Sequence, residues 1–262
     1  MVNSTTAPRD IVPNKRDKRV LGIIPARLDS QRLPGKVLRP ICGRPMLHVV
    51  YERASACSLL TELYVATDSE QVRQYCVQNR IPVFMTAATH RSGTERIVEV
   101  MYKVPADVYV NIQGDEPMLQ ASHLELLIEP FLTRPGIQVT TLKTPLSDAE
   151  APNPNVVKVV TNLRGQALYF SRAPIPYRRD SSAPLPFYKH LGFYAYSGEA
   201  LERYEVLPPA PLEQVEQLEQ LRFLQYGIPI QVAETAEDTI GVDTEEDLRA
   251  VVRYFESLRG RS

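Results

Sequence analysis

The sequence predicts an α/β fold, with a mostly parallel mixed sheet flanked by helices. Two observations lead to this prediction. Short apolar segments rich in β-branched residues alternate with amphipathic segments between residues 19 and 112, and this alternation is typical of a parallel sheet covered by helices on both faces. Between residues 139 and 171, strand-like segments follow one another directly. The second pattern predicts an added β region beside the main sheet.

The alternating part of the chain begins with RVLGIIP, a short β-branched run that predicts a buried strand. The first helix is expected to start at Pro45, because proline is favoured in the first turn. Strands are expected at residues 19–25, 62–67, 82–86 and 107–112, and helices at 45–57, 69–79 and 93–104. In an open α/β sheet, functional residues gather where the strands end.

The rest of the chain is less regular. We expect a helix at residues 122–132 and strands at 139–145, 156–160, 167–171 and 229–235. Residues 211–227 resemble one amphipathic helix that ends at a C′ glycine. The last helix should start at Thr244, with Asp247 completing a near capping box. The added strands are expected to cap a site or to pair two subunits.

The composition excludes several classes of protein. Thirty basic residues face 31 acidic ones, so the chain has no basic field to hold a nucleic acid. No apolar run approaches the roughly 18 to 20 residues that cross a bilayer, and residues 1–18 lack the apolar core of a secretory signal. Three cysteines without C-x-x-C spacing argue against a zinc site. We expect a cytoplasmic protein, with a mobile tail at residues 1–18 and a single α/β domain at 19–262.

A cluster of cations follows the first strand. Arg27, Arg32 and Lys36 lie within ten residues of each other in ARLDSQRLPGK. A solvated turn would explain them, but three cations beside strand-end N–H groups and a helix N-terminus would also form an anion site. The loop is not a P-loop, because that motif requires glycine where Ser30 stands and serine or threonine where Val37 stands. Side-chain cations would therefore hold any phosphate here.

Two carboxylates occupy similar places at strand ends. Asp115 follows a strand that must be buried, and Asp243 comes just before the last helix. A reverse turn would explain the first and helix capping the second, although Thr244 can already cap that helix. Two carboxylates with phosphate oxygens and water suit Mg²⁺. Together with the cations, they indicate phosphoryl or nucleotidyl transfer.

Other signals are weak when taken alone. HRSGTER, at residues 90–96, fits a loop that reads a base or the capped start of a helix. His190 fits an ordinary core or surface histidine. The carboxylates of Glu213, Glu216 and Glu219 are most simply the solvated face of an amphipathic helix.

Taken in order along the chain, the motifs are similar to those of one family. They are IIPAR, RLPGK, HRSGTER, VNIQGDEP, NPNVVKVV, ALYFSRAPIP, HLGFYAY, PLEQVEQLEQLR and GVDT. The chain resembles the 3-deoxy-manno-octulosonate (Kdo) cytidylyltransferases from about residue 20 to residue 255. The resemblance implies a Rossmann-like fold of the nucleotide-diphospho-sugar transferase type, usually a homodimer. It also implies that CTP and Kdo are converted to CMP-Kdo and pyrophosphate for lipopolysaccharide biosynthesis.

The resemblance also implies roles for individual residues. The positions that match CTP-binding residues of the family are Ala26, Arg27, Arg32, Lys36, Ser92, Gly93 and Arg96. Those that match the Kdo pocket are Gln113, Arg172, His190, Tyr194 and Glu219, and those that match the Mg²⁺ ligands are Asp115 and Asp243. Lys36, Arg27 and the two aspartates are the expected catalytic residues. Thr89 and Arg91 depart from the family pattern around His90, which leaves details of nucleotide contact open.

Two other functions remain open at this stage. One is a cytidylyltransferase that acts on another acidic sugar, such as a sialic acid or an amino analogue of Kdo. The other is a nucleotide-binding regulator without turnover, against which the presence of Lys36, Asp115 and Asp243 argues. A related glycosyltransferase is disfavoured because QGDEP lacks a D-x-D pair.

Overall fold

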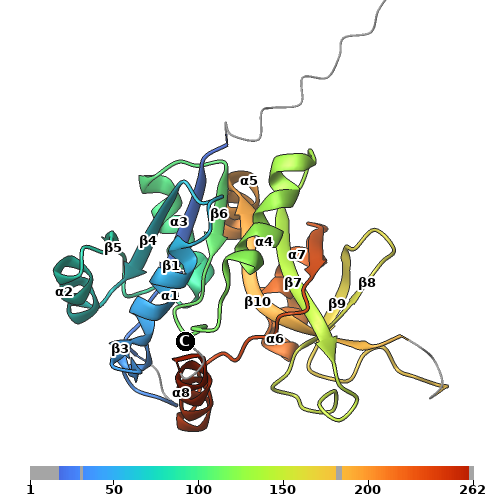
Figure 1. The fold of residues 1–262 in the computed structure, drawn as a ribbon. Helices are drawn as coiled ribbons and strands as arrows, with labels where there is room; N and C mark the ends of the chain where they lie inside the picture. Colours follow the sequence, from blue (N-terminus) through green and yellow to red (C-terminus); the bar gives the residue numbers. More distant parts are fainter. Residues whose placement is uncertain (1–17, 30–31, 181–184, 260–262) are drawn as a thin grey trace, which may run out of the picture.

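A computed structural model describes residues 18–29, 32–180 and 185–259 of the chain. Residues 1–17 of the predicted mobile tail lie outside the described residues. The polypeptide folds around one large mixed sheet with helices on both faces (Figure 1). The predicted fold class is therefore confirmed.

The central sheet has the strand order β11-β7-β10-β6-β1-β4-β5. The strands are β1 (Val20–Pro25), β4 (Glu62–Thr67), β5 (Val83–Met85), β6 (Val108–Asn111), β7 (Val139–Leu146), β10 (Phe187–Ser197) and β11 (Ile230–Glu234). Strands β6, β1, β4 and β5 are parallel to one another, whereas β10 runs antiparallel to both β6 and β7. Each strand that the alternating part of the sequence predicted is confirmed, with its ends shifted by no more than one residue.

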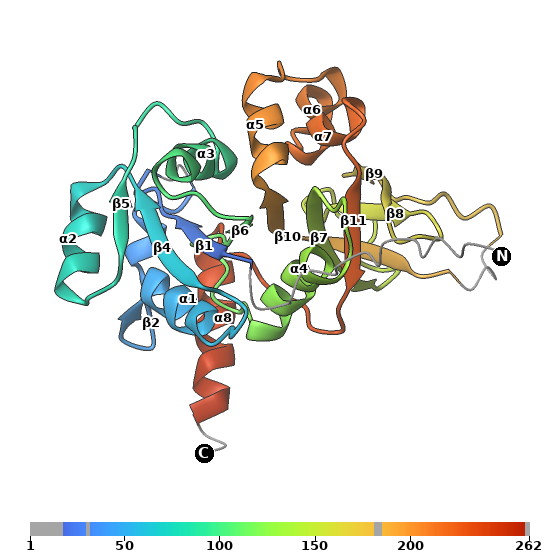
Figure 2. The same cartoon turned by 90° about the horizontal axis from the view of Figure 1, so that it is seen from above.

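Helices cover the sheet in two layers, which Figure 2 shows from above. One layer contains α1 (Met46–Ser55), α2 (Glu70–Gln78) and α4 (Ala121–Thr133), and the other contains α3 (Gly93–Lys103), α5 (Gly198–Val206) and α7 (Gln220–Gln225). The sheet strands contribute alternate side chains to the two buried clusters. In β1, for example, Ile24 packs toward α1 and α4, while Ile23 packs toward α3 and α5. Burial on both faces explains why β1 is apolar throughout.

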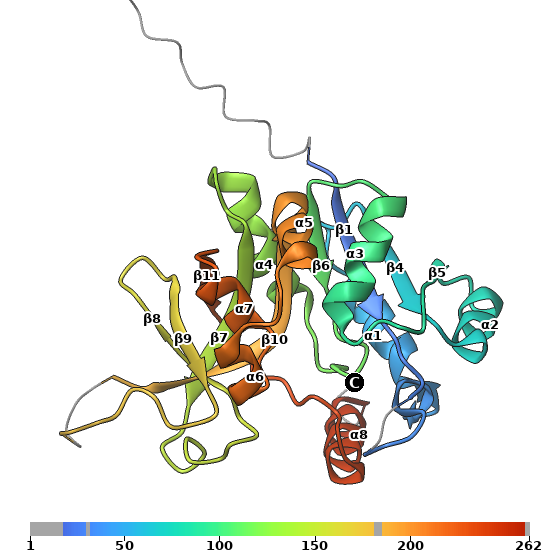
Figure 3. The ribbon, with the colours of Figure 1, turned by 180° about the vertical axis from the view of Figure 1, so that it is seen from behind.

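The expected β region beside the main sheet is present. Strands β8 (Lys158–Thr161) and β9 (Ala167–Ser171) form an antiparallel hairpin, and β8 also pairs with β10 (Figure 3). A smaller ribbon of β2 (Pro40–Ile41) and β3 (Arg44–Pro45) follows the 3₁₀ turn Lys36–Leu38. The hairpin extends the sheet at the end farthest from α2.

The prediction of one helix over residues 211–227 is wrong. Two short helices, α6 (Pro211–Glu216) and α7, are separated at Gln217, which adopts a left-handed conformation with φ 54°. Arg172 Nε donates to the carbonyl oxygen of Glu216 at 2.8 Å, and this bond satisfies a carbonyl at the end of α6. No glycine or proline marks the break in the sequence. Gly227, with φ 71°, ends α7 as expected.

The break also overturns the prediction of a solvated glutamate face. Glu213 is buried and accepts hydrogen bonds from Arg222 and from the backbone of Ala210. The Glu216 carboxylate accepts from Ser171 Oγ at 2.6 Å and therefore ties α6 to the end of β9. These carboxylates serve the packing of the helices and do not form a face that is exposed to water.

The last helix, α8 (Glu245–Arg259), begins as the sequence predicted. Thr244 Oγ1 accepts from the backbone of Asp247 at 3.2 Å, and the Asp247 carboxylate accepts from the backbone of Thr244 at 2.8 Å. Leu248 and Val251 pack against Ile41 and Met46 of the segment after β1. Among the described residues, no helix has the length and apolar character needed to cross a membrane.

Candidate active site

Two pockets meet at the carboxyl ends of β1 and β6. The charged pocket, about 460 Å³, is lined by Pro25, Arg27, Asp29, Arg32, Lys36, Val37, Gly93, Gln113, Gly114, Asp115 and Asp243. The aromatic pocket, about 380 Å³, is lined by Arg27, Gly93, Thr94, Asn111, Gln113, Asp115, His190, Gly192, Tyr194, Tyr196, Gln217, Leu218, Glu219, Gln220 and Phe223. They share Arg27, Gly93, Gln113 and Asp115, so the two pockets adjoin.

Lys36 joins the two predicted metal carboxylates. Its ammonium group forms an ion pair with Asp115 and another with Asp243, where Nζ lies 3.0 Å from Oδ1. Burial alone would lower the pKa of Lys36, but Asp115 and then Asp243 outweigh that effect and raise it. Lys36 therefore stays charged at neutral pH. The structure therefore brings the two aspartates together beside this cation, and their role as metal ligands stays a prediction.

The arginines of the same loop converge on this pocket. Arg32 Nη2 lies 2.9 Å from Asp243 Oδ2, and Arg27 Nη1 donates to the carbonyl oxygen of Arg91 at 3.0 Å. Because all three cations line one pocket, the loop is more than a solvated turn.

Two glycines at the site, Gly35 and Gly114, occupy positions where the backbone leaves no room or conformational freedom for a side chain. Gly35 has φ 65°, a conformation that L side chains rarely adopt, and it leads directly into the turn that carries Lys36. A Cβ atom on Gly114 would lie 2.9 Å from the carbonyl oxygen of Pro25. The loop after β6 therefore packs directly on the end of β1. The backbone N–H of Val242 then donates to the carbonyl oxygen of Asp115 at 2.8 Å and holds the two acidic segments together.

The two carboxylates that contact Lys36 are also suitable ligands for a magnesium ion. Oxygens of Asp115 and Asp243 already meet on one nitrogen atom, so the two carboxylates are close enough to share a cation. Carboxylate oxygen is the ligand that Mg²⁺ prefers. Within the described ranges, no group of three or more His, Cys, Asp or Glu side chains could hold a metal. Such an ion would need further oxygens from a ligand or from water.

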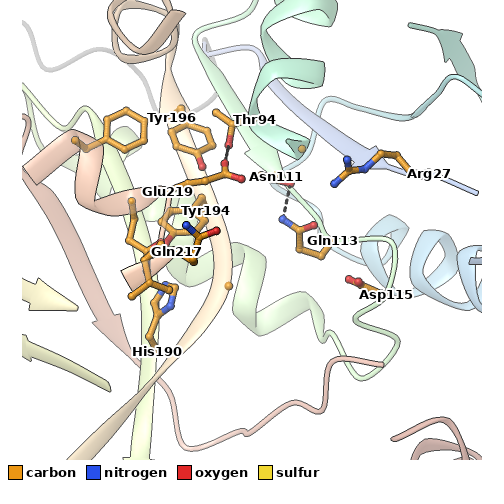
Figure 4. Close-up of a pocket in the computed structure, with 15 residues that line it drawn as sticks. Arg27, Thr94, Asn111, Gln113, Asp115, His190, Tyr194, Tyr196, Gln217 and Glu219 are labelled. Carbon is orange, nitrogen blue, oxygen red and sulfur yellow. Dashed lines mark hydrogen bonds between the residues drawn. The ribbon is translucent and has the colours of Figure 1, made fainter. Parts of the chain in front are cut away.

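One wall of the aromatic pocket is formed by β10 and another by residues 217–223 (Figure 4). The pairing of β10 with β7 shifts register between Leu191 and Tyr194, and Gly192 in that irregular segment lines the pocket. Such a bulge redirects side chains at a sheet. Tyr194 and Tyr196 stack with ring centroids 5.7 Å apart, and Tyr194 pairs in register with Asn111 of β6. The strand therefore presents its tyrosines beside the residues that follow β6.

His190 is neutral, and its hydrogen bonds indicate its tautomer. Burial lowers the pKa of His190 to about 3. Thr141 Oγ1 donates to the carbonyl oxygen of Phe193 at 2.8 Å, so it has no second proton for His190 Nε2, which lies 2.9 Å away. Nε2 must therefore carry the proton and donate to Thr141. His190 Nδ1 remains a hydrogen-bond acceptor.

Glu219 lies at the pocket wall opposite β6. Thr94 Oγ1 donates to its carboxylate at 3.3 Å, as Figure 4 shows. Glu219 is exposed along this wall, but the surrounding protein still desolvates its carboxyl group enough to raise the pKa, and the charge of Glu213 adds to the rise. The buried Tyr194 hydroxyl makes no hydrogen bond within the part of the chain that the structure describes.

Some expected contact residues lie behind the pockets instead of lining them. Arg96 is fully buried and paired with Asp68, and Ser92 caps α3 by accepting from the backbone of Glu95. Ala26 is buried under the end of β1. The Arg172 guanidinium donates to backbone carbonyl groups of residues 154, 216 and 217. The four residues surround the site, and their direct contact with a ligand stays a prediction.

Sequence reasoning missed several residues that line the pockets. They are Pro25, Asp29, Val37, Thr94, Asn111, Gly114, Gly192, Tyr196, Gln217, Leu218, Gln220 and Phe223. For two of these residues, the sequence contained a pattern that could have indicated a position in the site. Asn111 is a polar residue at the end of an apolar strand, and Tyr196 lies two residues from Tyr194, hence on the same face of a strand. Gln217 and Gln220 had no such signal, because nothing in the sequence marks the helix break that places them at the pocket.

Comparison with known proteins agrees with this geometry. The cytidylyltransferase family model matches residues 21–235. The 3-deoxy-manno-octulosonate cytidylyltransferase of Acidobacterium capsulatum is 54% identical over 232 residues, covering 88% of this chain and 94% of the relative. The enzyme of the same name from Escherichia coli is 47% identical over 229 residues, covering 87% and 93%. The chain belongs to the 3-deoxy-manno-octulosonate cytidylyltransferase family.

Solved structures of this family and of related folds extend the match. A CMP:2-keto-3-deoxy-manno-octonic acid synthetase complexed with CTP has a TM-score of 0.88 at 45% identity, covering 91% of this chain and 99% of that one. A 4-diphosphocytidyl-2C-methyl-D-erythritol synthase from Anaerococcus prevotii has a TM-score of 0.61 at 15% identity, covering 91% and 96%. The second likeness concerns the fold alone. Membership of the Kdo cytidylyltransferase family accounts for the series of motifs.

Proposed function

We propose that this chain transfers CMP from CTP to Kdo, giving CMP-Kdo and pyrophosphate for lipopolysaccharide biosynthesis. The main observation in support of this proposal is that the two pockets adjoin at Arg27, Gln113 and Asp115. The charged pocket suits a triphosphate and a divalent cation, and the aromatic pocket suits a polyhydroxylated sugar. Family membership and the CTP complex of the relative support the same reaction.

In this proposal, the nucleotide occupies the charged pocket. Arg27, Arg32 and Lys36 bind its phosphates, since CTP brings about four negative charges to a chain of net charge −1. The loop that carries Ser92 and Gly93, with Ala26 near it, borders the cytidine. Arg96, held from inside by Asp68, supports that loop from behind.

Kdo occupies the aromatic pocket. Gln113, Tyr194 and Glu219 offer donors and acceptors to its hydroxyl groups, and His190 offers an acceptor at Nδ1. Because His190 is neutral, it cannot supply a positive charge for the sugar carboxylate. That charge would come from Arg27, at the junction, or from Arg172 if its guanidinium releases the carbonyl groups of residues 216 and 217.

The reaction is an in-line attack of the anomeric hydroxyl of Kdo on the α-phosphorus of CTP, with pyrophosphate as the leaving group. It needs no nucleophilic side chain, so catalysis rests on positioning and charge. Lys36 and the two arginines stabilise the charge that develops on pyrophosphate. Mg²⁺ held by Asp115 and Asp243 would supply a Lewis acid at the phosphates and lower the pKa of a bound sugar hydroxyl. Gln113, which lines both pockets, orients the sugar toward the nucleotide.

The test is incubation of the protein with CTP, Mg²⁺ and a panel of 2-keto sugar acids, with detection of the CMP-sugar by mass spectrometry. The panel contains Kdo, an amino analogue of Kdo and a sialic acid. We expect CMP-Kdo and pyrophosphate in equal amounts. A product from a different acid alone would replace Kdo as the substrate. Mg²⁺-dependent CTP binding with no product from any acid would indicate a regulator.

We also propose a cytoplasmic homodimer formed by residues 19–262. The location follows from CTP, a cytoplasmic metabolite. The β8–β9 hairpin exposes Leu163 and Leu168, and the proline-rich segment before β10 exposes Tyr177 and Leu185. Exposed apolar side chains in an added β region support a subunit contact. Sedimentation equilibrium should give twice the monomer mass, and Leu168→Lys should shift it toward the monomer.

A further inference from the structure

The cations and carboxylates of the charged pocket neutralise one another. Lys36 Nζ contacts Asp115 Oδ2 and Asp243 Oδ1, and Arg32 Nη2 contacts Asp243 Oδ2 at 2.9 Å. Both oxygens of Asp243 are therefore bound by cations of one loop. The Lys36 side chain is only 15% exposed, so its ion pairs are weakly screened by water.

The proposed reaction needs these same groups for other partners. Lys36 and Arg32 are the groups proposed to bind the triphosphate, and Asp115 and Asp243 are the groups proposed to bind the metal. A carboxylate oxygen that accepts a hydrogen bond from an ammonium group uses a lone pair for that bond. The same lone pair cannot bind a metal ion at the same time. A divalent ion close to this ammonium would also be repelled by it. Each ligand must displace an ion pair before it can bind.

We propose that Lys36 and Arg32 act as positioning residues for the metal carboxylates, and that CTP and the metal load by one exchange of partners. The triphosphate takes the two cations as the metal takes the two carboxylates. Either ligand alone would leave charges of one sign unpaired, including Lys36 or Asp115, whose side chains are only 15% and 27% exposed, and this costs free energy. The two ligands therefore favour each other's binding, and by linkage the coupling is reciprocal. This inference rests on the proposed function of the site.

The exchange predicts an unusual behaviour of one metal-site variant. Asp243→Asn removes the carboxylate that competes with phosphate for Lys36 and Arg32. In EDTA, the variant should bind CTP about tenfold more tightly than the original protein, a gain of about 1.4 kcal/mol. A residue with only a structural role would not strengthen binding when removed. Isothermal titration calorimetry with CTP in EDTA measures the effect, after thermal unfolding has shown that the variant is folded.

Glu245→Gln is the matched control. It removes the same charge two residues further along the chain, and its partner Arg39, at 2.9 Å, does not line the two pockets of the site. Any long-range effect of net charge on CTP binding appears in both variants. The proposal is overturned if Asp243→Asn binds CTP in EDTA no more tightly than Glu245→Gln.

The reciprocal variant tests the metal side. Lys36→Met removes the ammonium from between the carboxylates, so Mn²⁺ should bind more tightly in the absence of nucleotide. Lys36→Arg keeps the positive charge, so its affinity for Mn²⁺ should stay that of the original protein. Electron paramagnetic resonance of free Mn²⁺ measures both. Unchanged Mn²⁺ affinity in Lys36→Met contradicts the exchange.

If the unmodified protein binds no CTP even with Mg²⁺, the proposed function itself fails. If it makes CMP-Kdo but the variants show no gain, only the exchange fails.

Discussion

Arg96 Nη2 lies 2.9 Å from Asp68 Oδ2, and this ion pair fixes the start of α3 from inside the protein. The Arg96 side chain is 0% exposed and also donates to Thr86 Oγ1. Asp68 follows β4 and Thr86 follows β5, so one guanidinium ties α3 to the ends of two strands. The loop that borders both pockets is anchored by this contact.

Loss of Asp68 should therefore destabilise the fold. Asp68→Asn leaves the Arg96 charge buried without its counterion, and such a change typically costs about 3 kcal/mol of unfolding free energy. Urea denaturation measures it. Glu62→Gln serves as the control, because its pair with Arg19 is partly exposed and should be worth less than about 1 kcal/mol. If Asp68→Asn keeps full stability but loses CTP affinity, Arg96 serves the ligand directly.

Loss of Asp115 should nearly abolish turnover in a folded protein. Asp115 lines both pockets and is one of the two proposed metal ligands. Removing one charged group from such a site typically costs about 3 kcal/mol of transition-state stabilisation, roughly a hundredfold in rate. Pyrophosphate release measures the loss in Asp115→Ala. Asp238→Asn, which breaks an exposed pair with Lys189, should keep its rate. Release at the original rate from Asp115→Ala would remove the metal assignment.

The charged pocket could be predicted from the sequence because Arg27 and Asp115 follow strand signals closely and Asp243 precedes a helix signal. Arg27 comes two residues after β1, Asp115 four residues after β6, and Asp243 just before α8. In a parallel sheet the carboxyl ends of neighbouring strands share one edge, so residues far apart in the chain meet there. Adjacent strands β1 and β6 bring the cations and Asp115 together in this way.

The aromatic pocket could not be predicted in the same way. One wall depends on β10, whose irregular register appears only when it pairs with β7. The other depends on the break at Gln217, which is supported by an arginine 45 residues earlier in the chain. Amphipathic spacing favours a continuous helix, and tertiary hydrogen bonds overrule it. Local sequence carries no trace of such contacts.

The left-handed backbone conformation of Gln217 should lower the stability of the fold while it places the Gln217 side chain for substrate binding. A non-glycine residue at φ 54° costs about 1 kcal/mol, and the Gln217 side chain lines the aromatic pocket. Gln217→Gly should raise the unfolding free energy by up to about 1 kcal/mol and raise the KM for Kdo. Arg80→Gly is the control, because exposed Arg80 has φ 57° and lines neither pocket of the site. It should gain stability and leave KM unchanged. An unchanged KM in Gln217→Gly would remove this residue from substrate recognition.

His190 should make stability depend on pH in a defined window. Its folded pKa is about 3, against 6.5 for an unperturbed histidine. Between these values the unfolded chain binds a proton that the folded protein does not bind, so stability is lost as pH falls below about 6.5. The loss approaches about 1.4 kcal/mol per pH unit. His190→Gln lacks this proton, so the stability gap between variant and original protein should shift by about 2 kcal/mol in favour of the variant between pH 7.5 and pH 5. Parallel stability curves in urea over that range would mean that His190 takes up its proton equally in the folded and the unfolded state, and the lowered pKa would then be wrong.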